Sequence, residues 1–198
     1  SRIDEFWPQT LAENARQWIT SRILRGTVQR LDAHLNLKPA DWENGITDRE
    51  TIYGQFIVVE GTVNYFPGLP IAEKLVATGW YDGMDLHLDI SDGLLENQNI
   101  RHITVNLSDI NGRDEHGMIQ IKTAGPVADL FRALDTPTLK HSQIFPIDST
   151  LLKGTIETDL EVKFPLLKDL EVEDLQVSGT ANLSNVAIRE FTLSPLLP

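Results

Sequence analysis

The chain has 198 residues, a formal net charge of −12, 41% hydrophobic residues and no cysteine. At this length about 70% of the surface of the unfolded chain can be buried, so a sizeable core is possible. The acidic balance argues against nucleic-acid binding, and the lack of cysteine excludes disulfides, thiolate metal sites and cysteine nucleophiles.

Two segments have the spacing of amphipathic helices. Over residues 8–24, apolar residues recur at steps of three and four: Leu11, Ala15, Trp18, Ile19 and Ile23. Over residues 126–135, Gly125-Pro126 introduces a second stripe: Val127, Leu130, Phe131 and Leu134. We therefore predict one helix in each range.

Most of the remaining chain alternates between apolar and polar residues. This pattern is typical of strands that bury one face and leave the other in water. The apolar members of the clearest runs are Leu31, Ala33, Leu35 and Leu37; Met84, Leu86, Leu88 and Ile90; Ile103, Val105 and Leu107; Ile156, Leu160, Val162 and Phe164; and Leu175, Val177, Ala181 and Leu183. About ten strands are expected from such runs.

Turn residues separate the alternating runs. Three pairs indicate hairpins because their residues tolerate positive φ: Asp82-Gly83, Asp92-Gly93 and Asn111-Gly112. A weak repeat, Gly-Thr followed by a small or branched apolar residue, begins at Gly26, Gly61, Gly154 and Gly179. Its uneven spacing excludes a regular solenoid, and it reflects either repeated strand units or common strand chemistry.

These elements predict a mainly β (α+β) fold. We expect a long, antiparallel, curved meander sheet, or a half-open barrel or groove, with two short helices packed on it. Helices of about 15 and 10 residues are only about 22 and 15 Å long, too short to cover the apolar face of so many strands. Either the sheet curls on itself or part of that face is open to a ligand.

We expect residues 1–198 to form a single β-rich domain that is a fragment of a larger protein. The sequence begins at Ser1 without a methionine and ends on an apolar segment. It contains no apolar run of about 18 residues, so any membrane-anchoring segment would lie outside it.

The best cluster for metal or acid–base chemistry is Asp85, His87 and Asp89, which share one strand face. The same alternation also describes the solvated face of an amphipathic strand. Neither a Gly-x-Ser-x-Gly elbow nor a Gly-rich phosphate loop is present. We therefore expect a protein without enzymatic activity, catalytic residues, metal or cofactor. A glycan-processing enzyme that uses Asp85 and Asp89 is the third hypothesis.

Aromatic residues are scattered along the chain and either line a sugar or lipid site or pack in the core and at its edges. They are Trp7, Trp18, Trp42, Tyr53, Tyr65, Phe66, Trp80 and Tyr81.

The order of several segments resembles the central region of YhdP-type, AsmA-like proteins of Gram-negative bacteria, over roughly residues 7–193. The segments that carry the resemblance are Arg16-Gln17-Trp18, Ile23-Leu24-Arg25-Gly26-Thr27-Val28, Gly61-Thr62-Val63-Asn64-Tyr65-Phe66-Pro67-Gly68-Leu69-Pro70-Ile71, Gly79-Trp80-Tyr81-Asp82-Gly83, Gly125-Pro126-Val127-Ala128-Asp129-Leu130-Phe131-Arg132-Ala133-Leu134 with Pro137, and Gly154-Thr155-Ile156 running to Phe164-Pro165-Leu166.

This resemblance implies a periplasmic, β-rich bridge that is tethered to the inner membrane and associated with phospholipid transport to, or maintenance of, the outer membrane. The implied partners are phospholipid acyl chains and other segments of the same full-length protein. It carries over no catalytic residues. From the alternation alone, the lipid-facing candidates are Met84, Leu86, Leu88, Ile90, Ile156, Leu160, Val162 and Phe164.

Two hypotheses remain open for that apolar face. Either it shields acyl chains, or it is a closed core. In the second case the chain is a structural or protein-interaction domain of the cell envelope without a lipid ligand.

Overall fold

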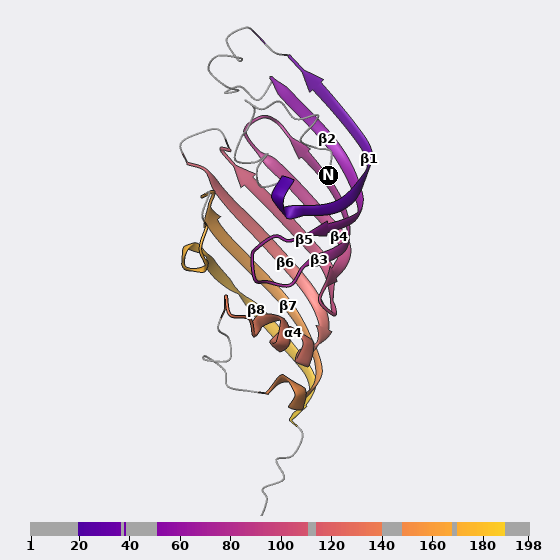
Figure 1. Cartoon of the computed structure of the whole chain (residues 1–198), viewed down its shortest axis with the longest axis vertical. Helices are drawn as coiled ribbons and strands as arrows, with labels where there is room; N and C mark the ends of the chain where they lie inside the picture. Colours follow the sequence, from indigo (N-terminus) through magenta and orange to yellow (C-terminus); the bar gives the residue numbers. More distant parts are fainter. Residues whose placement is uncertain are drawn as a thin grey trace, which may run out of the picture.

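A computed structural model of the chain describes residues 20–36, 38, 51–110, 114–139, 148–167 and 170–188. These residues form one sheet of eight strands in the order β1 to β8, each antiparallel to the next (Figure 1). The strands are β1 (Ile23–Leu35), β2 (Ile52–Val63), β3 (Ala72–Tyr81), β4 (Leu86–Leu95), β5 (Gln98–Ser108), β6 (His116–Pro126), β7 (Leu152–Pro165) and β8 (Gln176–Ile188).

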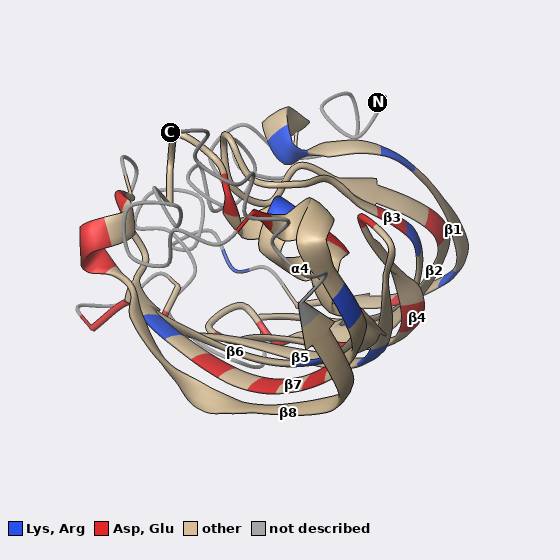
Figure 2. Ribbon diagram, turned by 90° about the horizontal axis from the view of Figure 1, so that it is seen from below, with Lys and Arg blue, Asp and Glu red and all other residues tan. Residues whose placement is uncertain are grey.

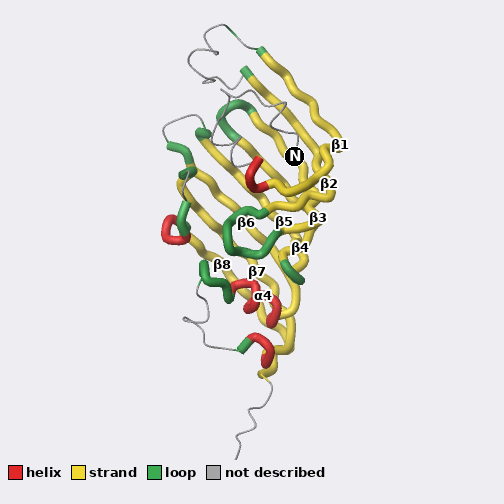
Figure 3. Tube along the Cα trace, viewed as in Figure 1, coloured by secondary structure: helices red, strands yellow, loops and turns green. Residues whose placement is uncertain are grey.

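The sheet is curved and does not close on itself (Figures 1 and 3). Strands β1 and β8 form its two edges and are not paired with each other. The predicted class, a mainly β fold with a curved antiparallel meander, is confirmed. The described residues hold eight strands where about ten were expected, because the strands are longer than the runs of strict alternation.

The second predicted helix is confirmed as α4 (Val127–Leu134), which follows β6 directly after Pro126. The ring of Pro126 fixes its φ at −64° and removes the amide hydrogen that would continue the β6 ladder, while its ψ of 134° is still extended. Pro126 is therefore the last residue of β6 and the N-cap of α4. Asp129 in the first turn pairs with Arg132, with Oδ1 and Nη2 2.7 Å apart. Short 3₁₀ turns occur at Ser149–Leu151 and Val172–Asp174.

Most of the first predicted helix, over residues 8–24, lies outside the described residues. Its described end at residues 20–22 is helical, and β1 then begins at Ile23. The helix therefore ends two residues before the predicted boundary. The cause is that Ile23 fits the helical spacing but also opens the β ladder by pairing with Val63.

One of the three predicted hairpin turns is wrong. Asp82-Gly83 does lie between β3 and β4, and Asn111-Gly112 lies outside the described residues. Asp92-Gly93, however, lies within β4, and the hairpin follows at residues 96–97, where Glu96 takes a φ of 55°. A glycine is needed at position 93 because the Leu75 side chain packs against its backbone, and a Cβ there would be 2.6 Å from Leu75 Cδ2.

The sheet has two chemically different faces. Helix α4 packs on the face that carries Ile156, and we call this the inner face. Figure 2 shows that α4 lies within the curve of the sheet, so the inner face is the concave one. The alternate residues of β7 point to the opposite, outer face, and they are Glu157, Asp159, Glu161 and Lys163. On that face the Lys122 ammonium is 3.1 Å from the Asp159 carboxylate.

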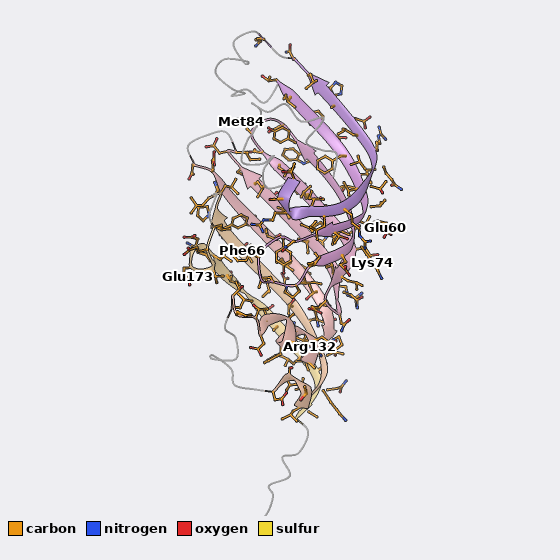
Figure 4. The ribbon with its side chains drawn as sticks, viewed as in Figure 1. Glu60, Phe66, Lys74, Met84, Arg132 and Glu173 are labelled. Carbon is orange, nitrogen blue, oxygen red and sulfur yellow. The ribbon has the colours of Figure 1, made fainter. Side chains whose placement is uncertain are left out.

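Irregular backbone runs across the sheet near the end that carries α4. Register shifts occur in the β1–β2, β2–β3, β3–β4, β5–β6 and β7–β8 pairs. Left-handed φ angles accompany them at Glu60 and Lys74, which lie along the same margin in Figure 4. Such bulges bend a strand and increase its twist, so a row of them curls the whole sheet.

The Gly-Thr repeat largely follows these bulges. Register shifts lie beside Gly26, Gly61 and Gly154, whereas Gly179 lies in a regular stretch of β8. Shared strand chemistry therefore explains the repeat better than repeated units.

Two small apolar cores lie on the α4 side of the bulges, and we call this part the closed end. One core contains Ala72, Leu75, Ile90 and Ile100, with Tyr65 packed on it from the loop between β2 and β3. Burial raises the pKa of Tyr65 to about 12. The other contains Val127 of α4 with Leu152 and Ile156 of β7. The Thr138 hydroxyl also donates to the Pro67 carbonyl at 3.3 Å, joining the β2–β3 loop to the segment after α4.

Candidate functional site

Beyond the bulges, the inner face is apolar across all eight strands, and we call this part the open end. Directly paired residues of antiparallel strands share a face, so the register defines rows across the sheet. One row is Leu31, Phe56, Gly79, Leu88, Val105, Ile119, Val162 and Val177. The neighbouring row borders the bulges, and its Ile90 is buried in the core of the closed end. Its members are Val28, Val58, Ala77, Ile90, Ile103, Ile121, Leu160 and Gly179. Neither row contains a polar side chain.

These rows are long enough to hold an acyl chain. Eight strands have seven gaps of about 4.8 Å, which gives a path of about 34 Å along the curve. The half-thickness of a bilayer core, which matches one acyl chain, is about 15 Å. The open end therefore offers a continuous apolar surface longer than its candidate ligand.

Large side chains cover the glycines within this surface. Phe164 lies over Gly117, where a Cβ would be 2.4 Å from the ring. Phe56 and Leu88 both approach Gly79 in the same way. The glycines thus let neighbouring side chains lie flat, which leaves a smooth apolar floor.

Most side chains of the open end are only partly buried. Leu86, Leu88, Leu160 and Val162 are half-buried, in contrast to Ile156, which is 3% exposed beneath α4. The edge strands are more exposed still, with Leu31 at 63% and Val177 at 60%. Exposed apolar side chains gathered on one face are typical of a surface that binds a ligand or a partner.

The structure places seven of the eight predicted lipid-facing residues on inner-face strand positions. Leu86, Leu88, Leu160, Val162 and Phe164 lie in the open end, whereas Ile90 and Ile156 are buried in the two cores. Met84 precedes β4, in a turn where its carbonyl accepts a hydrogen bond from the Ile110 amide at 2.8 Å. Lipid contact by these residues stays a prediction.

Sequence alternation did not reveal the polar groups buried on the inner face. Gln98 is fully buried at the start of β5, and its amide donates to the Pro126 carbonyl at 2.8 Å. The hydroxyls of Thr123 and Thr158 lie 2.7 Å apart in the same region. Gly125 was the available signal, because only a residue without a side chain lets Gln98 come so close.

The predicted acid–base cluster divides into two structural roles. Asp85 lies in the turn before β4 and accepts a hydrogen bond from the Asp109 amide at 3.1 Å. His87 and Asp89 lie on the outer face of β4, with Nε2 and Oδ2 2.8 Å apart. Among the described residues no group of three potential ligands is arranged to hold a metal ion.

Both ring nitrogens of His87 face acceptors. Nδ1 donates to Asn106 Oδ1 at 2.7 Å and Nε2 donates to Asp89. Only the imidazolium can donate from both nitrogens, so this geometry favours the protonated form. The hydrogen bond to Asn106 is the main cause of a raised His87 pKa, and partial burial opposes it. The hydrogen bond from His87 in turn lowers the pKa of Asp89.

These shifts predict a pH dependence of stability. The contribution of His87 to the free energy of unfolding should be complete below the unfolded-state pKa of about 6.5. It should disappear as pH rises through the higher pKa of the folded state. The Asp89 contribution should disappear as pH falls below about 4. An Asn106→Ala variant should lower the His87 pKa, as measured by NMR titration of the ring, and should flatten the pH dependence of unfolding above pH 6.5. Gln120→Ala, on the same face, is the matched control. An unchanged His87 pKa in Asn106→Ala would show that this hydrogen bond is not the cause.

No helix within the described ranges is long and apolar enough to cross a membrane. Searches of curated proteins and of solved structures returned no significant match. A family model described as YhdP protein matches residues 1–195. This match covers nearly the whole chain, and it is consistent with a periplasmic envelope protein from a family not known for enzymatic activity. The chain therefore belongs to the YhdP protein family.

Proposed function

We propose that this chain is a non-catalytic segment of a periplasmic protein anchored in the inner membrane, and that its inner face carries phospholipid acyl chains. The process served is phospholipid transport to the outer membrane, or maintenance of that membrane. The observation that carries the proposal is the pair of uninterrupted apolar rows across eight strands, in which most side chains stay partly exposed on a concave surface. Family membership supports it.

The charge distribution favours acyl chains over other apolar ligands. On β7, acidic residues face outward and apolar residues face inward, so a headgroup at the sheet margin meets water and the hydrocarbon does not. Burial of hydrocarbon contributes about 25 cal/mol per Å² of apolar surface, without any directional contact. A smooth floor of this kind suits chains that slide and need no specific recognition.

The edges support continuity with other segments of the same protein. Strand β8 has 13 residues without a charge or a proline, although charges and prolines are the usual protection of a free edge. Strand β1 presents Leu31 and Leu35, both more than 60% exposed. Further strands that pair with these edges would extend the apolar rows in both directions.

The same edge favours the second candidate, a structural or protein-interaction domain of the envelope. An uncharged edge strand is a template for strand addition by a partner. In that reading the open end is covered by protein and holds no lipid.

Native mass spectrometry of the purified chain, with organic extraction and lipid analysis, separates the two functions. We expect phospholipid at about one molecule or more per chain. Chain that purifies without lipid, and that takes up none from phospholipid vesicles, would contradict the conduit and favour the interaction domain.

A further inference from the structure

A hollow lies on the opposite side of the sheet from the proposed lipid surface. It lies over β1 to β4, has a volume of about 320 Å³, and we call it the outer hollow. The side chains that matter for its chemistry are Arg30, Asp32, Gln55, Trp80, His87 and Asp89. All six occupy outer-face positions of the register, because Asp32, Gln55, Trp80 and His87 are successive partners.

Trp80 provides a flat apolar wall. Its indole stacks on the His87 ring, with centroids 5.7 Å apart and planes 19° from parallel. Because His87 approaches from β4, the other face of the indole is turned toward β2, where Gln55 is its register partner. Sequence reading left open whether such aromatic residues line a site or pack in the core, and the structure puts Trp80 at the hollow.

The polar groups around this wall are held in place by one another. His87 is fixed at both nitrogens by Asn106 and Asp89. Asp89 also accepts from the Thr104 hydroxyl at 3.3 Å. The Arg30 guanidinium donates to Asp32 at 2.5 Å. His87 and Asp89, which are held by bonds to β5, lose little conformational entropy when a ligand binds, whereas Arg30 and Asp32 are exposed side chains of one strand.

The balance of charge selects the class of ligand. The Arg30 guanidinium and the His87 imidazolium are balanced by two carboxylates, Asp32 and Asp89, so the outer hollow has no excess positive charge for a phosphate or a nucleic acid. A neutral ligand with one flat C–H face and many hydroxyls matches both the aromatic wall and the mixed donors and acceptors. The volume lies at the lower end of the range for small-molecule sites, about 300–1,000 Å³.

We propose that the outer hollow is a binding site for a neutral saccharide, with a sugar ring stacked on Trp80 and its hydroxyls bonded to Gln55, Arg30 and Asp89. This site is independent of the lipid surface because it lies on the other face of the same strands. The chain would then hold a glycan on one face while it carries hydrocarbon on the other.

Saturation-transfer NMR on the purified chain tests this site with cellotetraose, maltotetraose and chitotetraose. Each is used at about 10 mM, about ten times the Kd of a millimolar site. We expect at least one to receive saturation. We also expect it to shift one of the four tryptophan indole signals, the one that Trp80→Phe removes. Trp80→Ala should lower the affinity at least about tenfold, since it deletes the stacking wall.

The control is Gln176→Ala, which changes an exposed residue in the same cross-strand row but outside the outer hollow, and it should bind like the unchanged chain. Should Trp80→Ala fail to fold, Gln55→Ala alters an exposed side chain and should weaken binding in its place. The proposal is overturned if no tetrasaccharide binds, if binding survives both variants, or if tetramethylammonium binds at the hollow and no sugar does. Retention of phospholipid is a separate readout, so failure here leaves the lipid proposal untouched.

Discussion

Replacing Leu160 by aspartate should remove phospholipid from the purified protein while the chain still unfolds cooperatively. Leu160 lies in an apolar row of the open end, half-buried, with Gly179 and Ile121 as register partners. A carboxylate in contact with hydrocarbon costs several kcal/mol, so lipid occupancy should fall by more than about tenfold. The loss of folding stability should be smaller, about 1–2 kcal/mol, because water already reaches this site.

The matched control for this experiment is Met118→Asp. Met118 is also apolar and half-buried, but it lies on the outer face opposite Lys163. It should keep its phospholipid in the same extraction and mass-spectrometric assay. If Leu160→Asp unfolds the chain, the open end is a closed core and the conduit is wrong. If both variants keep their lipid, the ligand binds elsewhere.

Replacing Ile156 by alanine should destabilise the fold by about 2–5 kcal/mol. Its side chain is 3% exposed and packs with Val127 and Leu152 in the core that fixes α4 to the sheet. Truncation leaves a cavity that the rigid strand and helix can fill only in part. Urea unfolding followed by circular dichroism measures the change.

Val162→Ala is the comparison for Ile156→Ala. Val162 lies on the same face of β7, three inner-face positions beyond Ile156, but it is half-buried in the open end. Its truncation should cost less than about 1.5 kcal/mol. Equal costs at the two positions would show that the sheet has one uniform core and no open end.

Period-two alternation predicted which strand residues share the inner face, with the exception of Met84, which lies in the turn before β4. It is a local property of a strand, so Leu86, Leu88, Leu160, Val162 and Phe164 could be assigned to one side without knowledge of the register. Alternation could not tell the open end from the closed end. That difference depends on where α4 and the β2–β3 loop fold back, which buries Ile90 and Ile156 but not Leu88 or Leu160.

Other features were beyond sequence reading because they depend on contacts between distant strands. The Asp92-Gly93 prediction failed because Gly93 makes room for Leu75 of β3. In the sequence, a glycine required by such a contact cannot be distinguished from a glycine required by a turn. The outer hollow could not be predicted either, although the sequence patterns single out both Trp80 and His87. Their stacking follows from the β3–β4 register, which the two separate patterns do not contain.

The bulges that cross the sheet divide each strand into a part under selection for folding and a part under selection for the shape of the apolar surface. On the α4 side, a change of side-chain volume acts on the cores and hence on the amount of folded protein. In the open end, the same change alters the width and shape of the apolar surface and has less effect on folding. Under the proposed function, ligand preference can therefore change in evolution through residues such as Leu88 and Val105 while the fold persists. A designer could vary those positions without first restabilising the protein.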